Sequence, residues 1–128
     1  MIELLGNSLI TLLVIQLTWQ YVARFGCDTI GNDKVPTYYQ NHGIREIVLS
    51  ATLAILMLIF TWFGDSDLSL ILLTISGVGL VGCYWIAVAC VGLGRQFEDD
   101  ASDDIVPHVN HAIQVVVLAA ALTLKWIA

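Results

Sequence analysis

The sequence is short of charged residues, and of basic residues above all. Asp, Glu, Lys and Arg together make up 12% of its 128 residues, and only five of these are Lys or Arg. Soluble domains carry about twice that share of charge. A protein that binds a nucleic-acid backbone needs clustered Lys and Arg, and so does a polybasic segment that anchors to anionic lipid. The composition argues against both classes, and we expect no nucleic-acid partner.

Cysteine is scarce as well. The three cysteines include no CxxC pair, and an odd number gives no complete disulfide framework. No nucleophile–base pair, phosphate-binding glycine loop or metal-binding motif stands out along the chain. We therefore expect that the protein is not an enzyme.

Apolar side chains are abundant, at 58% of the residues. A soluble protein of this size could not bury so much apolar surface, because its surface is large relative to its volume. Four apolar runs reach the roughly 20 residues that a helix needs to cross about 30 Å of hydrocarbon. They occupy residues 2–23, 44–63, 68–94 and 105–128.

These runs are continuous, without the alternation of barrel strands, and only helices and closed barrels can span lipid. We therefore predict an all-α integral membrane protein. Its four transmembrane helices should form a four-helix bundle, with one transmembrane domain over residues 1–128.

Basic residues near the connecting segments predict the orientation. Arg24, Lys34 and Arg45 flank the first connector, residues 24–43. Arg95 opens the third connector, whereas the second, residues 64–67, has no basic residue. The positive-inside rule places connectors one and three in the cytoplasm and both termini on the same, non-cytoplasmic side. The N-terminus lacks the basic stretch of a secretory signal, so we expect the first run to be retained, in a bacterial inner membrane or equivalent.

Two connectors carry local signals. Tyr38 and Tyr39 suit the headgroup level of a bilayer, since each ring has an apolar body and a polar tip. Ser66 or Asp67 is placed to cap the helix that begins at residue 68.

Small residues recur along the third helix and predict a packing face. In lipid, helices associate where small side chains let their backbones approach. The residues on this stripe are Ser69, Ser76, Gly79, Cys83, Ala87, Cys90 and Gly94. Cys83 and Cys90 could instead form a redox or metal pair, but about 10 Å of helix axis separates them. Packing is the favoured interpretation.

Polar residues form stripes on the first and fourth helices. They are Glu3, Asn7, Thr11 and Thr18 on the first, and His111, Gln114 and Lys125 on the fourth. Polar groups in a span are costly, so we expect both stripes to face the bundle interior or a wet lumen. Glu3 and Lys125 belong to the same end of the bundle. We predict that these two helices are neighbours and that the two charges approach each other, the alternative being that both side chains extend to the interface.

The three histidines lie near the cytoplasmic ends of predicted spans. His108 and His111 are three residues apart and share a helix face, while His42 precedes the second span. Histidine at this level is what a haem, quinone or metal site would use. It is also a natural interfacial residue. The three histidines are therefore candidate cofactor ligands, with haem as a possible cofactor.

Three functions follow from these patterns. The first is a non-catalytic structural or accessory subunit of a membrane assembly, which associates with itself or with other membrane subunits through helix packing. The second is an oligomeric pore, such as a holin or small channel, lined by the polar stripes. The third is a haem- or quinone-binding membrane anchor of an electron-transfer complex.

Overall fold

The computed structural model describes residues 1–26, 30–91 and 105–128, and these contain helices but no strand. The elements are α1 (Ile2–Thr18), the π-helix η1 (Trp19–Phe25), α3 (Thr37–Phe63), α4 (Asp67–Val91) and α5 (Ile105–Ile127). Four stretches are long and apolar enough to cross a membrane: Ile2–Val22, Thr37–Phe63, Asp67–Cys90 and His108–Ile127. The predicted all-helical chain with four such helices is confirmed.

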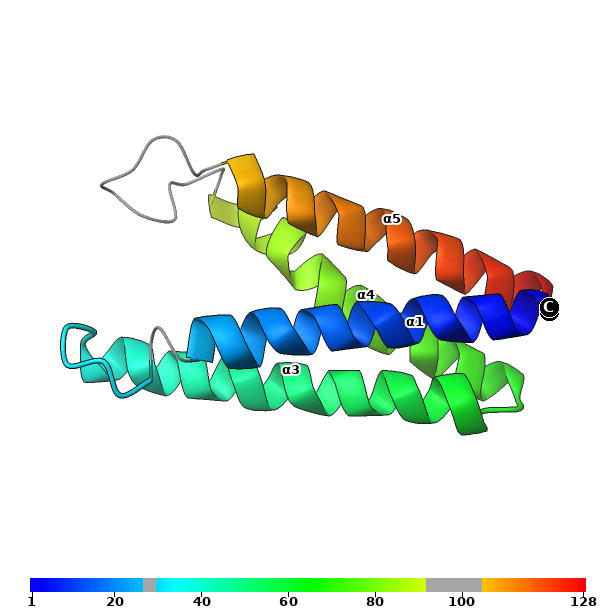
Figure 1. Ribbon diagram of the computed structural model, residues 1–128, viewed down its shortest axis with the longest axis horizontal. Helices are drawn as coiled ribbons and strands as arrows, with labels where there is room; N and C mark the ends of the chain where they lie inside the picture. Colours follow the sequence, from blue (N-terminus) through cyan, green and yellow to red (C-terminus); the bar gives the residue numbers. More distant parts are fainter. Residues whose placement is uncertain (27–29, 92–104) are drawn as a thin grey trace.

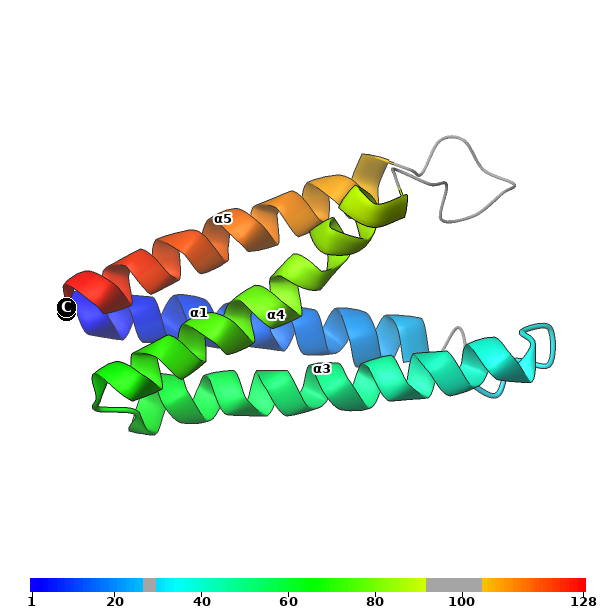
Figure 2. The same cartoon turned by 180° about the vertical axis from the view of Figure 1, so that it is seen from behind.

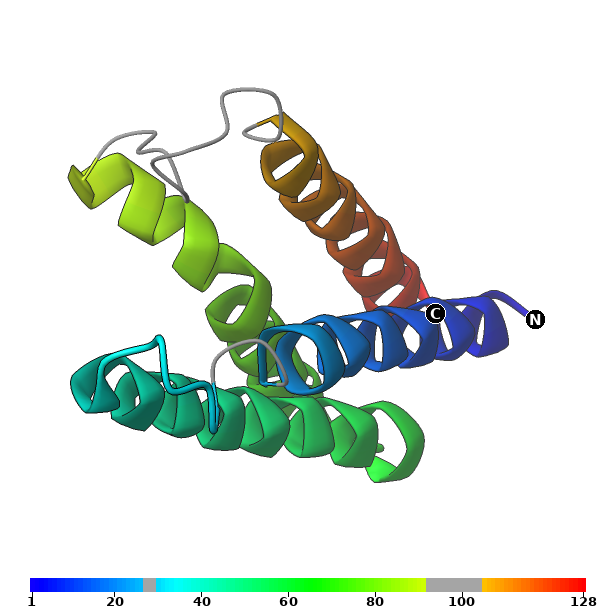
Figure 3. The ribbon, with the colours of Figure 1, turned by 60° about the vertical axis from the view of Figure 1, so that its left-hand side comes forward.

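The helices form a bundle in which sequence neighbours are not always spatial neighbours. α1 packs against α5 and α3, and α4 packs against α3 and α5 (Figure 1). Seen from behind, α4 runs from the end of α3 to the start of α5 (Figure 2). Both chain termini lie at one end of the bundle (Figure 3). The predicted contact between the first and last helices is therefore confirmed, while the side of a membrane that the termini face remains a prediction.

The core is narrow and lies where the four helices meet. α1 contributes Ile10, Leu13, Val14 and Leu17, whose spacing places them on adjoining parts of one helix face. The other helices contribute Ala54, Met57, Leu73, Leu80, Val81, Leu118, Ala121 and Leu122. Many other large apolar side chains, such as Leu12, Ile75 and Val116, are exposed. An outer surface of this kind suits lipid better than water.

α3 begins earlier than the apolar pattern predicts. Its first residue is Thr37, so the expectation of a connector reaching residue 43 is wrong over residues 37–43. Pro36 precedes the helix with an extended backbone (ψ 141°), and its carbonyl accepts the amide N–H of Tyr39 at 2.9 Å. The Gln40 side chain donates to the carbonyls of Asn32 (3.0 Å) and Val35 (2.8 Å), which ties the connector to the helix. Hydropathy could not show this, because these first two turns are polar.

The turn between α3 and α4 contains one of the two predicted helix caps. The Ser69 backbone N–H donates to Ser66 Oγ at 3.2 Å, so the prediction that Ser66 caps this helix is confirmed. Gly64 is needed here for space, because a Cβ at this position would lie 2.5 Å from the Phe60 carbonyl oxygen. The turn therefore fixes α4 closely beside the end of α3.

Candidate functional site

Five polar residues meet between α1, η1 and α5. We call them the amide–imidazole cluster: Gln16, Gln20, Asn110, His111 and Gln114. Gln16 and Gln20 are one turn apart, at the join of α1 and η1. The cluster lies at one end of both span-length stretches, since Gln20 comes just before Val22 and Asn110 just after His108. Buried polar groups within a span mark a candidate functional site in a membrane protein.

Gln114 is the centre of the cluster. Its Nε2 donates to Gln16 Oε1 at 2.9 Å and to Gln20 Oε1 at 2.8 Å. Asn110 Nδ2 also donates to Gln20 Oε1, at 2.9 Å. Gln16 Nε2 in turn donates to Asn110 Oδ1 at 3.3 Å. The amides therefore link α5 to both turns of the neighbouring helix.

His111 uses both ring nitrogens inside the cluster. Gln20 Nε2 lies 3.4 Å from His111 Nε2, and His111 Nδ1 lies 2.9 Å from Gln114 Oε1. The amide nitrogen can only donate, so Nε2 is the acceptor and Nδ1 carries the proton. The geometry thus fits a neutral imidazole. His111 and Gln114 are 4% and 2% exposed, so these bonds are shielded from solvent.

Tyr84 connects the cluster to α4. Its ring stacks on His111, with centroids 3.7 Å apart and planes 15° from parallel. Its hydroxyl is hydrogen-bonded to His108 Nδ1. Aromatic stacking of this kind adds roughly 0.5–1.5 kcal/mol to the burial itself. Three of the four span-length helices are therefore joined through one group of side chains.

η1 widens the helix where Gln20 enters the cluster. The Gly26 N–H bonds to the Tyr21 carbonyl, which is the five-residue spacing of a π-helix. Such segments are rare and are found frequently at functional sites. The irregular turn thus coincides with the polar contacts.

The three candidate cofactor histidines do not converge. His108 and His111 lie together on α5, but His42 lies on α3, diagonally across the bundle (Figure 3). His42 is exposed and packs edge-on against Tyr38, with ring centroids 4.6 Å apart. Within the described part of the chain, no three His, Cys, Asp or Glu side chains are grouped as a metal site requires.

The charged pair predicted at the other end of the bundle is present. Lys125 Nζ lies 3.4 Å from Glu3 Oε1 and 3.4 Å from the Thr61 carbonyl oxygen. The Lys125 side chain is 8% exposed and that of Glu3 65%. The prediction that these two charges approach each other is therefore confirmed.

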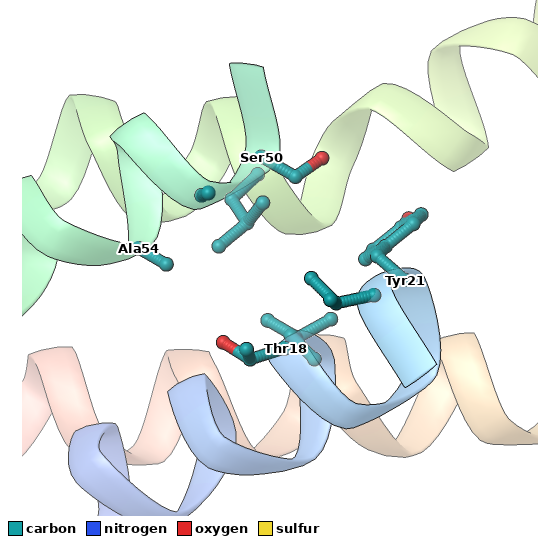
Figure 4. Close-up of a pocket in the computed structure, with 8 residues that line it drawn as sticks. Thr18, Tyr21, Ser50 and Ala54 are labelled. Carbon is teal, nitrogen blue, oxygen red and sulfur yellow. The ribbon is translucent and has the colours of Figure 1, made fainter. Parts of the chain in front are cut away.

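Two residues of the polar stripe on α1, Thr11 and Thr18, face α3. Thr11 Oγ1 accepts a hydrogen bond from Trp62 Nε1 at 3.0 Å and donates to the Asn7 carbonyl. Thr18 lines a small cavity against Ser50 and Ala54 (Figure 4). Thr11 and Thr18 thus have α3 as their neighbour, whereas His111 and Gln114 of the α5 stripe contact Gln16 and Gln20. The two predicted stripes do not line one common path.

The cavity in Figure 4 is too small for a cofactor. It lies between α1, η1, α3 and α4, and its volume is about 10 Å³. That is about the space for a single water molecule. Its lining is mainly apolar, with Leu17, Val22 and Leu80 beside the residues that the figure labels.

The small-residue stripe of α4 divides between the inside and the outside. Ser76 is buried and Ser69 half-buried, whereas four of the later members are exposed: Gly79, Cys83, Ala87 and Cys90. Gly94 lies outside the described residues. The tightest approach is at Gly77, which was not part of the predicted stripe. A Cβ there would lie 2.8 Å from Leu118 Cδ1.

Sequence reasoning missed three residues of the cluster, Gln16, Gln20 and Asn110, and also Tyr84, which stacks on His111. The signal available was the pair of glutamines one turn apart in an apolar span, since polar pairs inside a span seek partners on another helix.

Comparisons of the chain with protein-family models, with curated proteins and with solved structures find no match.

Proposed function

We propose that this protein is a non-catalytic subunit of a membrane assembly, which associates with further copies or with other membrane subunits. The proposal rests on a difference between the polar side chains inside the bundle and the small side chains on the outer side of α4. The polar side chains between α1, η1 and α5 bond to one another, while small side chains of α4 are exposed. The cluster thus needs no outside partner, and α4 still offers a packing surface.

The amide–imidazole cluster supports a structural role. In lipid, hydrogen bonds between helices replace the contacts that polar groups would otherwise make with water. Here Gln114 uses both amide hydrogens and its oxygen, and His111 uses both ring nitrogens. His111 is therefore left with no free ring nitrogen for a metal ion.

The outer α4 face supports association. We define it as Gly79, Cys83, Ala87 and Cys90, all of which are exposed, and the Cys83 thiol also lies near Tyr21 of η1. A Cβ added at Gly79 would meet only Leu53 Cδ1, at an ordinary 3.8 Å. Space is therefore available for a second helix to approach the α4 backbone closely, which is how helices associate in lipid.

Other functions have less support from the geometry. A pore lined by both polar stripes would need them on one path, but they have different neighbours. A haem held between helices would need free imidazole nitrogens that face each other. Both nitrogens of His111 are engaged, and His42 lies on the far side of the bundle.

In the bilayer, the bundle would lie with both termini on the non-cytoplasmic side. This follows from the basic residues that flank the first and third connectors. A bacterial inner membrane or an equivalent membrane is the expected location.

The test is the mass of the protein purified in mild detergent. We expect a stable complex larger than one chain, without a visible chromophore. Gly79→Ile combined with Ala87→Ile should reduce the complex to single chains, because the added side chains hold a neighbouring helix away. The matched control is Ala120→Ile, which adds the same side chain at an exposed position of α5.

Two results would contradict the proposal. One is a wild-type protein that purifies only as single chains and brings no other membrane protein with it. The other is a complex that Ala120→Ile disrupts as strongly as the α4 variants do.

A further inference from the structure

A groove on the outer surface of α3 is the feature that the proposed function does not use. Its volume is about 550 Å³. It is lined by His42, Ile44, Arg45 and Glu46, followed along the helix by Val48, Leu49 and Thr52. The charged residues thus lie toward the start of the helix, and mainly apolar residues follow them.

This change coincides with the expected boundary of the hydrocarbon layer. Arg45 precedes the last residue of α3, Phe63, by a stretch of helix about 27 Å long, close to the thickness of the hydrocarbon core. The turns before Arg45 carry Tyr38, Tyr39 and His42, and they extend past the end of α1 (Figure 1). Thr52 lies about 10 Å deeper than Arg45. The groove therefore reaches from the headgroup level to the acyl chains.

Neither charged residue of the groove forms an ion pair with another described residue. Arg45 and Glu46 are both exposed, and within the described residues the ion pair that forms is between Lys125 and Glu3. Adjacent residues on a helix point in directions about 100° apart, so Arg45 and Glu46 do not pair with each other. The groove offers a cation and an anion side by side, and its charges cancel while His42 is neutral.

Such a pair complements a headgroup that itself carries both charges. An arginine guanidinium binds a phosphate through two parallel hydrogen bonds, and a carboxylate accepts hydrogen bonds from an ammonium group. A headgroup that carries only a negative charge would place its phosphate close to the Glu46 carboxylate, with no ammonium group to offset the repulsion.

We propose that this groove binds a zwitterionic glycerophospholipid with a primary ammonium headgroup, of the phosphatidylethanolamine type. The phosphate lies against Arg45 and His42, and the ammonium against Glu46. One acyl chain follows Val48, Leu49 and Thr52. The Thr52 hydroxyl donates to the Val48 carbonyl at 2.8 Å, so it presents no free donor to the chain.

Native mass spectrometry of the detergent-purified protein tests this directly. The protein is titrated with phosphatidylethanolamine, phosphatidylglycerol and phosphatidylcholine that have the same acyl chains. We expect the ethanolamine lipid to bind most tightly. Arg45→Gln and Glu46→Gln should each weaken its binding about three- to tenfold, as the loss of a charge-assisted contact does.

Lys34→Gln is the matched control, because it removes a charge from the exposed connector outside the groove. Its binding should equal that of the wild type. The elution profile and circular dichroism of each variant establish that it is folded. The α4 variants should bind the lipid normally, so this proposal and the subunit proposal fail independently.

Equal binding of the three lipids would overturn the assignment. So would tighter binding of phosphatidylglycerol that increases in Glu46→Gln, because the groove would then select negative charge alone. A loss in Lys34→Gln as large as that in Arg45→Gln would also overturn it.

Discussion

The two ends of the α1–α5 interface hold their polar side chains in different ways. At one end, the amide–imidazole cluster consists of formally neutral groups that bond to one another at 2.8–3.4 Å. At the other end, Lys125 makes two contacts of 3.4 Å, one of them to a largely exposed carboxylate. Two buried oxygens also lack a hydrogen-bond partner within the described residues, Asn7 Oδ1 and Thr61 Oγ1.

The difference follows from the chemistry of the groups. An amide or a neutral imidazole both donates and accepts, so a few of them can complete one another's hydrogen bonds. An ammonium group only donates, and its charge is costly to bury. We therefore expect the neutral end to contribute more to stability than the charged end, although the charged end is the more conspicuous in the sequence.

The largest effect is expected at the centre of the cluster. Gln114→Leu introduces an apolar side chain of similar length. It removes three hydrogen bonds and leaves His111 Nδ1–H without an acceptor. The loss should be about 2 kcal/mol of unfolding free energy, since hydrogen bonds between membrane helices are individually modest. Detergent-induced unfolding followed by circular dichroism measures it.

Thr123→Val is the control for this variant. Its hydroxyl is exposed and bonds to the Ala119 carbonyl of its own helix at 2.8 Å. Its effect should stay within about 0.5 kcal/mol. If Gln114→Leu were no worse than Thr123→Val, the cluster would not hold the helices together.

A smaller effect is expected at the charged end. Lys125→Met preserves the alkyl packing against Gly6, which lies close to Lys125 Cγ, and removes the buried ammonium. Glu3 is exposed enough to remain solvated. The change in unfolding free energy should be about 1 kcal/mol or less, of either sign. If Lys125→Met lost more unfolding free energy than Gln114→Leu, measured in the same way, the charged end would contribute more to stability than the neutral end.

The smallest effect is expected at Thr61. Thr61→Val replaces a buried hydroxyl, whose oxygen has no partner among the described residues, with a methyl group of similar size. The variant should unfold at the same detergent concentration as the wild type or slightly above it, a gain of up to about 1 kcal/mol. A clear loss would mean that this hydroxyl makes a stabilising contact.

Much of the fold could be predicted from the sequence, because helix number depends on long apolar runs. The ends of α5 and the Ser66 cap follow from the same local signals. The start of α3 could not be predicted from these signals. Its first turns are polar, and Gln40 gains its role only through bonds to Asn32 and Val35 in the folded connector.

The cluster was harder to predict, because it depends on how α1 is rotated. Gln16 lies about 140° around an ideal helix from Glu3, so a stripe drawn through Glu3 and Asn7 excludes it. Gly6 of α1 lies against Ala121, Leu124 and Lys125 of α5, and composition does not show which face makes that contact. The same holds for α4, where residue size alone does not separate the buried Gly77 from the exposed Gly79.

We expect lipid, and not water, to surround most of the outer surface of the bundle. Detergent removal tests it most directly, with and without added phospholipid vesicles. We expect the protein to aggregate in plain buffer, and to float with the vesicles, helical and unfolding cooperatively, when lipid is supplied. A monodisperse, helical protein in buffer without detergent or lipid would contradict the account.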